Sequence, residues 1–297
     1  MNYDYIIIGG GPAGATAAYS LQKSGASCLI LEREQTKKEK VCGGLLTWTG
    51  IRLLKEAGID LSSLLTKGAK RILHFIVVKN CEERTYSYHA GEYGLGLRRV
   101  IFDSLLLNEA KNIGVNIQYG INVKKFTYEN KKFQVGINYS KRLILASGAR
   151  GYIVGKDTYL KQSFGLSAQI LGKSDLYDDS VYFWYPDNSD MYVWCIPNGN
   201  AIWNIGIWFP KYCNDAKTIF KKYYGIYIAR HFDEYCYMRQ LTGGFCGNVD
   251  MSRFLPNNCF GIGDFAGFNS NSTGEGIRYA IESALNLSRM MRYKHAR

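Results

Sequence analysis

The 297-residue sequence predicts an α/β fold in which a discontinuous parallel-sheet domain carries an inserted, mainly antiparallel β-sheet domain. Three observations carry this prediction. Residues 5–32 follow a strand, glycine-rich turn, helix and strand pattern. Residues 151–247 contain strand patterns with many aromatic residues and no second turn of that glycine-rich kind. The alternation of strand and helix returns from residue 259 to the final helix.

The N-terminal unit has the element order of a dinucleotide-binding site. An apolar strand, Tyr5–Ile8, leads into a glycine-rich turn, and a second apolar strand, Cys28–Leu31, ends at Glu32. A carboxylate at that strand end can accept hydrogen bonds from ribose hydroxyls. Because strand, turn, helix, strand and acid occur in order, we interpret this segment as a Rossmann-type unit rather than as a glycine-rich turn of another α/β protein.

The glycines of the turn, Gly9-x-Gly11-x-x-Gly14, each meet a steric demand. Gly9 permits the tight turn, Gly11 lets the backbone approach a pyrophosphate, and Gly14 lets the helix pack closely on the strands. The helix predicted from Pro12 directs its unpaired N–H groups and its positive dipole end at the phosphates. Enzymes that bind FAD and enzymes that bind NAD share these contacts, so the turn leaves the choice of dinucleotide open.

The charge of the sequence restricts the partners of the protein. There are 37 Lys and Arg against 25 Asp and Glu, which gives a formal net charge of +12. This charge favours anionic partners: a phosphorylated substrate, a nicotinamide phosphate, an acidic carrier protein or an anionic lipid surface. Nucleic acid is not expected, because the lysines are spread along the chain and no nucleic-acid motif accompanies them.

The sequence contains no pattern typical of a membrane span, a signal peptide or a metal site. No segment reaches the length of a transmembrane helix, and no basic region with an apolar signal core opens the chain, so we expect a cytoplasmic protein. The positive charge adds peripheral association with a membrane surface as a hypothesis. The eight cysteines form no Cys-x-x-Cys pair and the four histidines are dispersed, so we expect free thiols and no metal site.

The segment between the first unit and residue 150 combines strand and helix patterns. An amphipathic helix is predicted from about Arg99 to Asn112, because apolar residues recur there at helical spacing and Gly114 ends the pattern. A shorter helix is predicted at Thr49–Ala57. The predicted strands are Ile72–Lys79, Arg84–His89, Tyr93–Leu97, Val115–Tyr119, Val123–Tyr128, Phe133–Ile137 and Leu143–Ala146.

The strand-rich segment that follows is expected to form most of the inserted domain. A hairpin turn is predicted at Asn198-Gly199 and a basic amphipathic helix at Asp215–Ile228. The predicted strands are Ser180–Tyr185, Met191–Ile196 and Ala201–Phe209. Alternation along these strands places two apolar groups on separate faces, namely Tyr192, Trp194 and Ile196 on one face and Trp203, Ile205 and Ile207 on another.

The C-terminal segment returns to the first domain. A predicted strand, Cys259–Ile262, ends at Gly263-Asp264, and Thr273-Gly274-Glu275-Gly276 opens a final helix. The first domain is therefore interrupted by the second. We assign to the first domain residues 1–71, 96–155 and 255–297, and to the inserted domain residues 72–95 and 156–254.

Four motifs in one order make the sequence resemble a known group of flavoproteins. They are the first unit with its acid, Arg99-x-x-Phe102-Asp103, the strand ending at Ser147-Gly148, and Gly263-Asp264-Phe265-Ala266-Gly267 with Thr273-Gly274-Glu275-Gly276-Ile277. This order resembles the FAD-dependent, p-hydroxybenzoate hydroxylase-like superfamily. Two further motifs make the sequence most similar to the geranylgeranyl reductase family within it, Cys42-Gly43-Gly44 and Tyr192-Val193-Trp194-Cys195-Ile196-Pro197.

The resemblance implies a Rossmann-type FAD-binding domain with an inserted substrate domain. In that family the Gly-Asp carboxylate, here Asp264, binds a ribitol hydroxyl of FAD. The Thr-Gly-Glu-Gly segment brings backbone N–H groups and a helix N-terminus to the flavin, where the helix dipole favours negative charge on the reduced ring. The implied cofactor-binding residues are Gly9, Gly11, Pro12, Ala13, Gly14, Glu32, Arg33, Cys42, Gly43, Arg99, Gly148, Gly263, Asp264, Gly274, Gly276 and Ile277.

The implied catalytic residues are Cys42, Gly43, Tyr192 and Trp194. Cys42 is expected to line the flavin face, where it could protonate a carbon atom or carry a covalent flavin bond. Packing of a small residue is the alternative interpretation of Cys42. Tyr192 and Trp194, together with Trp203, are interpreted as an apolar wall for substrate, with the core of a β-sheet as the alternative.

The sequence departs from the family pattern in places that concern the substrate. The segment 269–272 reads Asn-Ser-Asn-Ser where the family has a proline, and Phe265 replaces a small residue. Asn198-Gly199 stands where a lysine is common, and because the sequence stops shortly after the final predicted helix, we expect the C-terminal helical region of the family to be missing. These departures leave the implied FAD contacts unchanged.

The leading functional hypothesis is an FAD-dependent oxidoreductase that saturates carbon–carbon double bonds of a prenyl or other apolar substrate, with an anionic head, by hydride transfer from flavin N5. No second Gly-x-Gly-x-x-Gly turn occurs, so we expect NAD(P)H to bind transiently, or an external reductase or ferredoxin to supply electrons. The alternative is an FAD-dependent monooxygenase or halogenase acting through a flavin C4a-hydroperoxide, because residues 191–197 also resemble a halogenase segment. A third hypothesis is a flavin-binding protein without catalysis.

Overall fold

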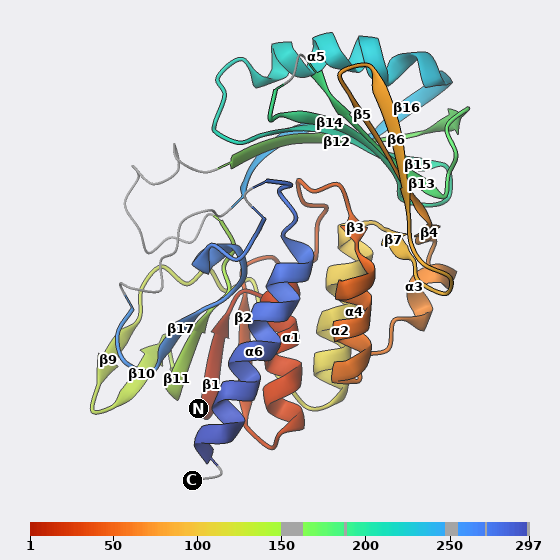
Figure 1. The fold of residues 1–297 in the computed structure, drawn as a ribbon. Helices are drawn as coiled ribbons and strands as arrows, with labels where there is room; N and C mark the ends of the chain where they lie inside the picture. The colour runs from red at the N-terminus through yellow and green to blue at the C-terminus, as the bar shows by residue number, and fades with distance from the viewer. Residues whose placement is uncertain (150–162, 187–188, 247–254, 271, 296–297) are drawn as a thin grey trace.

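Two large β-sheets and one small sheet organise the fold (Figure 1). The computed structural model describes residues 1–149, 163–186, 189–246, 255–270 and 272–295. One large sheet lies beside a layer of helices, and the other curves over the end of that layer beneath helix α5 (Ala216–Tyr227). Within the described ranges, no helix is both long and apolar enough to cross a membrane.

The first sheet is mainly parallel and has the predicted Rossmann character. Its order is β8-β2-β1-β11-β10-β9, and β17 also pairs with β11. Strands β8, β2, β1, β11 and β17 are parallel, whereas β10 and β9 form an antiparallel excursion. The strands are β1 Asn2–Ile8, β2 Cys28–Glu32, β8 Asn116–Tyr119, β9 Thr127–Glu129, β10 Lys132–Val135, β11 Asn138–Leu145 and β17 Cys259–Gly261.

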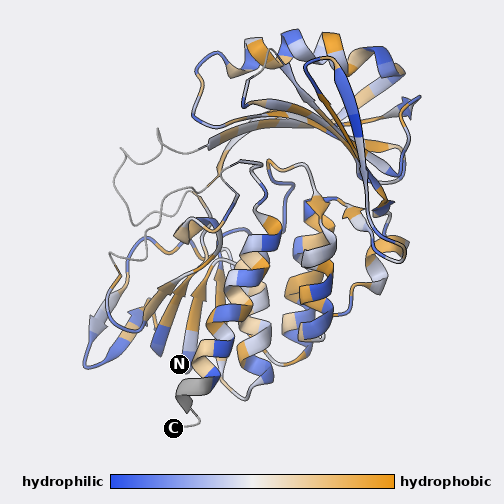
Figure 2. Cartoon of the chain, viewed as in Figure 1, coloured by the Kyte–Doolittle hydropathy of each residue, from blue (hydrophilic) through white to orange (hydrophobic). Residues whose placement is uncertain are grey.

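Helices cover one face of this sheet. Helix α1 packs against both α4 and α6, and α2 packs against α6. Their apolar residues form the main core with those of β1, β2 and β11, and Figure 2 shows the hydrophobic residues concentrated along these strands. Tyr5–Ile8 is buried throughout because a central parallel strand is covered on both faces. The helices are α1 Pro12–Lys23, α2 Trp48–Ala57, α3 Ser62–Thr66, α4 Arg99–Asn112 and α6 Ile277–His295.

The second sheet is mainly antiparallel, as predicted, and has the order β16-β12-β15-β14-β13-β5-β6. The pairing of β13 with β5 is parallel, which joins the early segment of the chain to the later one. Helix α5 packs against β12 and β14. The strands are β5 His74–Lys79, β6 Glu82–Ser87, β12 Ser163–Ser174, β13 Ser180–Tyr185, β14 Tyr192–Pro197, β15 Ile202–Phe209 and β16 Phe232–Cys246.

The two faces of the second sheet have different neighbours. The groups predicted from alternation are separated as expected, with Tyr192, Trp194 and Ile196 in one cluster and Trp203, Ile205 and Ile207 in the other. The second cluster contains residues of α5. The expectation that Trp203 shares a wall with Tyr192 and Trp194 is therefore wrong, because its ring packs edge-on against Phe232 on the α5 side.

Several element boundaries differ from the prediction. The predicted strand Ile72–Lys79 is divided, because β4 (Lys70–Ile72) belongs to the small sheet β3-β7-β4 and β5 to the large one. The remaining strands of the small sheet are β3 Leu45–Leu46 and β7 Gly94–Gly96. The predicted strand Leu143–Ala146 is only the end of β11, whose first half alternates buried polar with exposed residues. Residues 234–245, for which no element is given above, all lie in the single strand β16, whose pairing with β12 contains register shifts.

Candidate active site

The glycine-rich turn lies between β1 and α1, and its steric demands match the prediction. A methyl group built on Gly14 would lie 1.9 Å from the Gly9 carbonyl oxygen, and one built on Gly9, whose φ is +104°, would lie 2.5 Å from that of Ala146. At Gly11 a methyl group would meet only the Lys40 ammonium, 3.4 Å away. Helix α1 has no side-chain cap and no acidic residue in its first turn. Its N–H groups are therefore open to an anion.

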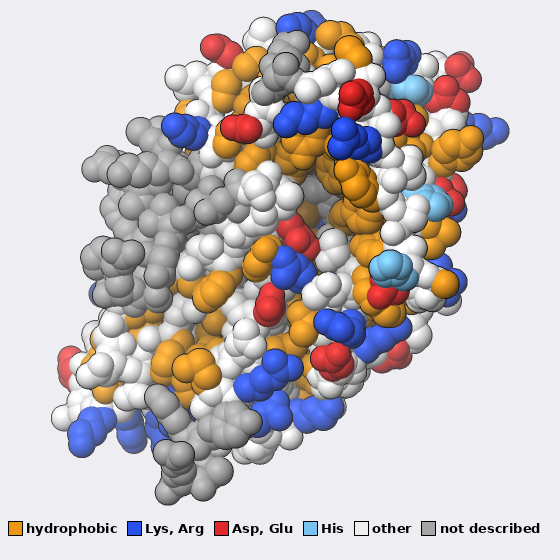
Figure 3. Space-filling model, in the orientation of Figure 1, with side chains coloured by type: hydrophobic (Ala, Val, Ile, Leu, Met, Phe, Trp, Pro, Cys, Tyr) orange, Lys and Arg blue, Asp and Glu red, His pale blue; other side chains and the backbone are white. Residues whose placement is uncertain are grey.

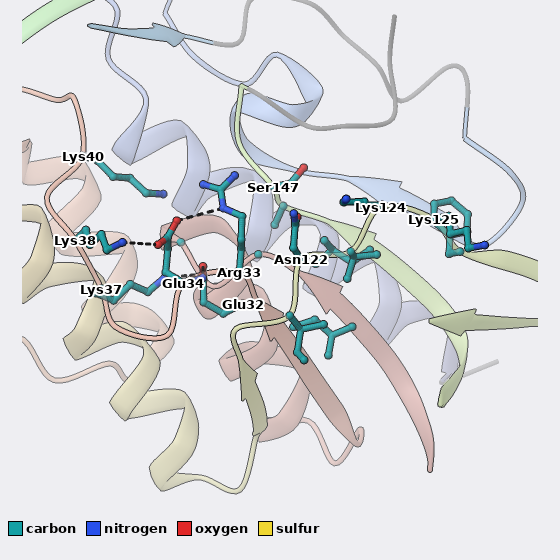
Figure 4. Close-up of a pocket in the computed structure, with 18 of the residues that line it drawn as sticks. Glu32, Arg33, Glu34, Lys37, Lys38, Lys40, Asn122, Lys124, Lys125 and Ser147 are labelled. Atoms are coloured by element: carbon teal, nitrogen blue, oxygen red, sulfur yellow. Dashed lines mark hydrogen bonds and ion pairs between the residues drawn. The ribbon is translucent and has the colours of Figure 1, made fainter. Parts of the chain in front are cut away.

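A cavity of about 280 Å³ opens beside this turn, at the carboxyl ends of β1 and β2 (Figure 4). The turn residues Gly9 and Gly11 line it, together with Glu32. The predicted Arg33 also lines it and pairs with Glu34 at 3.2 Å. Five lysines complete the wall, namely Lys37, Lys38, Lys40, Lys124 and Lys125. This concentration of positive charge suits a ligand that carries a diphosphate.

Glu32 lies at the end of β2, as the sequence predicts, and is buried. Its Oε2 atom accepts hydrogen bonds from the Gly10 N–H at 2.8 Å and from the Lys37 ammonium at 2.6 Å. Its Oε1 atom accepts one from the Glu34 N–H at 3.0 Å. The contact with Lys37 had no sequence signal, because Lys37 is one of several lysines in a charged run. Binding of ribose by Glu32 stays a prediction.

These contacts predict that Glu32 stabilises the fold in a pH-dependent way. Burial raises the pKa of Glu32, but the Lys37 charge and the hydrogen bonds outweigh it and hold the pKa below its ordinary value of 4.5. A carboxyl group with a lowered folded-state pKa stabilises the fold above its unfolded pKa, and this contribution is lost as the pH falls through the folded value. We expect Glu32→Gln to reduce the free energy of unfolding at pH 7 by about 1.5–3 kcal/mol.

The measurement is urea unfolding of the FAD-free protein across a pH series, with Glu129→Gln at an exposed position as the control. The difference in the free energy of unfolding between the wild type and Glu32→Gln should have its maximum value above pH 4.5 and should decrease below that pH. A difference that stays constant down to the acid limit would contradict the assignment.

Charged side chains from separate segments meet beside the turn. Arg99 donates to the two carboxylate oxygens of Asp103 at 2.9 and 3.1 Å, and the Lys40 ammonium lies 3.9 Å from Asp103. Burial lowers the pKa of Arg99, but Asp103 outweighs it and the net shift is upward. Sequence reasoning missed Lys40, which lines the cavity. Because two Arg99 donors are engaged by Asp103, contact of Arg99 with the cofactor stays a prediction.

Asp264 follows β17 in a short 3-10 turn, η5 (Gly263–Ala266). A methyl group on Gly276 would lie 3.2 Å from the Asp264 carboxylate, so the two C-terminal motifs are adjacent. Burial raises the pKa of Asp264, and the positive charges of Lys40 and Arg99 oppose this shift. Arg99, Asp264 and Gly276, predicted from two motifs far apart in the sequence, thus lie around one position.

The turn 273–276 lies at the start of α6 against the second sheet. The Tyr192 hydroxyl donates to the Thr273 carbonyl oxygen, and burial raises the pKa of Tyr192 well above its ordinary value. The Trp208 ring stacks on Tyr192 with centroids 5.4 Å apart. A methyl group on Gly274 would lie 2.6 Å from the Trp208 ring nitrogen, so only glycine fits there.

The loop that carries Cys42 and Gly43 is held against the same sheet by two asparagines. The Asn204 side-chain N–H donates to the Cys42 carbonyl oxygen at 2.7 Å, and that of Asn198 donates to the Gly43 carbonyl oxygen at 3.3 Å. The Trp194 ring N–H donates to the other end of the Asn204 amide at 2.8 Å. Sequence reasoning missed both asparagines in this role, because only Asn198 was noted, as a turn residue.

The structure brings the predicted catalytic residues together. The rings of Tyr192 and Trp194 lie 6.1 Å apart, and a methyl group on Gly43 would lie 3.5 Å from the Trp194 ring nitrogen. The Cys42 thiol accepts a hydrogen bond from the Gly44 N–H at 3.4 Å. In the space-filling view, hydrophobic side chains border a hollow between the second sheet and the helices (Figure 3).

The remaining predicted residues lie at element ends around this position. Pro12 and Ala13 are buried at the start of α1, and Ile277 begins α6. Gly148, with φ of +77°, follows β11, and a methyl group there would meet nothing within 4 Å. The glycine cradle, the open helix terminus, the cationic cavity and the Asp264 carboxylate together fit a bound FAD.

Comparisons with known proteins agree with this geometry. Residues 2–144 match the FAD binding domain family. A digeranylgeranylglycerophospholipid reductase of Methanococcoides burtonii is 28% identical over 302 residues, covering 95% of this chain and 72% of the relative. A solved geranylgeranyl bacteriochlorophyll reductase-like protein from Thermoplasma acidophilum has a TM-score of 0.81 at 21% identity, covering 97% of this chain and 77% of that one. A flavin-dependent brominase has a TM-score of 0.79 at 20% identity, covering 97% and 78%.

The two solved structures show a fold that is shared by proteins with reductase and halogenase names, so the fold alone does not select the reaction. The family match supports FAD as the dinucleotide, which the first unit left open and the resemblance implied, and the reductase relative agrees with the resemblance drawn from the motifs. The chain is an FAD-dependent oxidoreductase whose residues 2–144 match the FAD binding domain family, and it is similar to proteins named as geranylgeranyl-type reductases.

Proposed function

We propose that the protein reduces carbon–carbon double bonds of a prenyl or similarly apolar substrate, with FAD as its redox cofactor. The observation that supports this most is the aromatic sheet face of Tyr192, Trp194 and Trp208, which adjoins the Cys42 loop and the turn 273–276. Such a face excludes water and holds an apolar chain by contact. Bound FAD would supply the hydride that this reduction requires.

The side chains divide the remaining work. Tyr192 holds the turn 273–276 against the sheet, because its hydroxyl donates a hydrogen bond to the Thr273 carbonyl oxygen and its raised pKa keeps that hydroxyl protonated. Trp194 holds Asn204, which in turn fixes the backbone of Cys42 at the edge of the aromatic face. We assign proton delivery to the Cys42 thiol. The Arg99 guanidinium lies beside this thiol.

The domain division and the electron source are part of the same proposal. Residues 1–71, 96–155 and 255–297 would bind FAD, and residues 72–95 and 156–254 would bind substrate; the pairing of β5 with β13 supports this division. The boundaries near residues 155 and 254 lie outside the described residues. NAD(P)H or an electron-donor protein would reduce the flavin. Peripheral membrane association rests on the net charge of +12 and is checked with anionic liposomes at low salt.

The test is anaerobic turnover of the reduced holoenzyme with geranylgeranyl diphosphate, followed by mass spectrometry of the product. We expect a gain of one H₂ per reduced double bond. Trp194→Phe, which removes the N–H donor to Asn204 and part of the wall, should lower kcat/KM by about tenfold or more. Trp203→Phe is the matched control, because Trp203 is equally buried on the opposite face of the sheet and should leave kcat/KM unchanged.

Two outcomes would contradict the proposal. One is the absence of any reduced product although the flavin is reduced and reoxidisable. The other is an equal loss of kcat/KM in the Trp194 and Trp203 variants, since that would assign the effect to general destabilisation of the sheet rather than to the face beside the cofactor motifs.

A further inference from the structure

Arg239 is placed on the cofactor-facing side of the second sheet. Across the adjacent strands β15, β12 and β16, the register aligns Asn204 with Gln169 and Gln169 with Arg239. Residues directly opposite one another in a ladder direct their side chains to the same face. Asn204 bonds the Cys42 loop, so this row of polar side chains runs outward from that loop. Arg239 also donates to the Ser167 hydroxyl, which belongs to the same face.

The guanidinium of Arg239 has no ion-pair partner among the residues that the structure describes. Its Nε atom is buried and makes no hydrogen bond. Among the described residues, no carboxylate forms an ion pair with it. The negative charge of Glu39 acts on Arg239 electrostatically, but the Glu39 carboxylate forms its ion pair with Arg98, at 2.8 Å. Burial lowers the pKa of Arg239, and Glu39 and Cys42 oppose this shift. A buried donor of a charged group without an acceptor is unfavourable, and an oxyanion would satisfy it with strong, oriented hydrogen bonds.

The neighbours of Arg239 extend the same polar strip. Gln169, which is 3% exposed, lies between Asn204 and Arg239 in this row. On the other side of the strip, Trp194 lies over β15, where a methyl group on Gly206 would meet its ring at 2.2 Å. One sheet face therefore carries a polar strip, Ser167, Gln169 and Arg239, beside an aromatic surface, Tyr192, Trp194 and Trp208.

We propose that Ser167, Gln169 and Arg239 form a subsite for an oxyanion headgroup, a phosphate or a carboxylate, on a substrate whose apolar chain lies along the aromatic surface. Arg239 neutralises the charge, while the Ser167 hydroxyl and the Gln169 amide complete the hydrogen bonds of the oxygens. The inference rests on the proposed function in that it concerns the same substrate site. It assigns the binding of the anionic end of that substrate to three named residues.

The experiment compares the binding of two saturated ligands, dodecyl phosphate and dodecanol, to the oxidised holoenzyme, followed by the flavin absorbance spectrum and tryptophan fluorescence. Neither ligand has a double bond, so the result does not depend on turnover. We expect the phosphate to bind about ten- to a hundredfold more tightly than the alcohol. Arg239→Gln should abolish this preference without changing the affinity for dodecanol, and Arg239→Lys should retain part of it.

Arg230→Gln is the matched control, because Arg230 is an exposed arginine that precedes the same strand. It removes an equal charge and should leave the preference intact. FAD content and the unfolding temperature of each variant establish that the fold is retained. Both ligands carry the same dodecyl chain, so only the headgroup differs between them.

A preference for phosphate that persists in Arg239→Gln, or that falls equally in Arg230→Gln, would overturn the proposal. Equal binding of the two ligands by the wild type would overturn it as well. The proposed reaction is tested independently of the subsite. If Arg239 controls the preference for phosphate but no prenyl substrate is reduced, the results support the subsite and contradict the reductase function.

Discussion

Replacement of Gly11 by alanine is expected to leave the protein folded and to weaken FAD binding by about ten- to a hundredfold. The backbone of Gly11 has φ of −78° and ψ of −174°, which alanine adopts without strain. The added methyl group would meet only the mobile end of Lys40, 3.4 Å away. It would, however, occupy the space through which a pyrophosphate approaches the N–H groups of α1.

Gly14→Ala provides the contrast, because its methyl group would lie 1.9 Å from the Gly9 carbonyl oxygen. That contact forces α1 away from β1, so we expect Gly14→Ala to lower the unfolding temperature of the FAD-free protein and Gly11→Ala to leave it unchanged. FAD titration of the apo-protein by fluorescence quenching gives the affinity. Wild-type affinity in Gly11→Ala would show that the pyrophosphate does not approach the turn at this residue.

Replacement of Arg99 by methionine is expected to reduce the free energy of unfolding by about 3–5 kcal/mol. The side chains of Arg99 and Asp103 are 10% and 1% exposed, and two parallel hydrogen bonds join them one helical turn apart. Without Arg99, the Asp103 charge would remain buried with only Lys40 at 3.9 Å to compensate it. Removal of one partner of a buried pair costs far more than removal of both.

The double variant Arg99→Met, Asp103→Leu should therefore recover much of the lost stability. Arg98→Met is the comparison at a more exposed pair, since Arg98 and Glu39 are 30% and 13% exposed, and we expect it to cost about 1 kcal/mol or less. Urea unfolding of the FAD-free proteins measures the free energies of unfolding of the wild type and of these three variants. A double variant no more stable than Arg99→Met would show that the helix needs these side chains for their packing rather than for the ion pair.

The sequence predicted well those features that arise from local pattern. The order of strand, turn, helix and strand at the N-terminus follows from hydrophobic runs and glycine positions, and the structure has it as β1, α1 and β2. Alternation in the segment 192–209 assigned the two sheet faces correctly. Period two suffices there because successive side chains of a strand point to opposite faces of the sheet.

The features that sequence reasoning missed depend on partners far apart in the chain. Asn204 holds Cys42, 162 residues away, and nothing in the sequence around either residue indicates that contact. The Lys37 and Lys40 contacts arise in a charged segment without periodicity, where one lysine cannot be distinguished from the next. Trp203 was misplaced in the substrate wall because it is a large aromatic residue of the same hairpin as Trp194, although alternation had assigned the two residues to separate faces, which the structure confirms.

In the proposed function, the cofactor site serves reduction of a carbon–carbon bond rather than activation of oxygen. Rapid mixing of the anaerobically reduced holoenzyme with aerated buffer tests it most directly, with the flavin absorbance spectrum recorded over time. We predict slow reoxidation in a single phase, from the reduced to the oxidised spectrum, with no transient absorbing species. Fast reoxidation through an intermediate spectrum would contradict the claim and would assign this site to hydroxylation or halogenation.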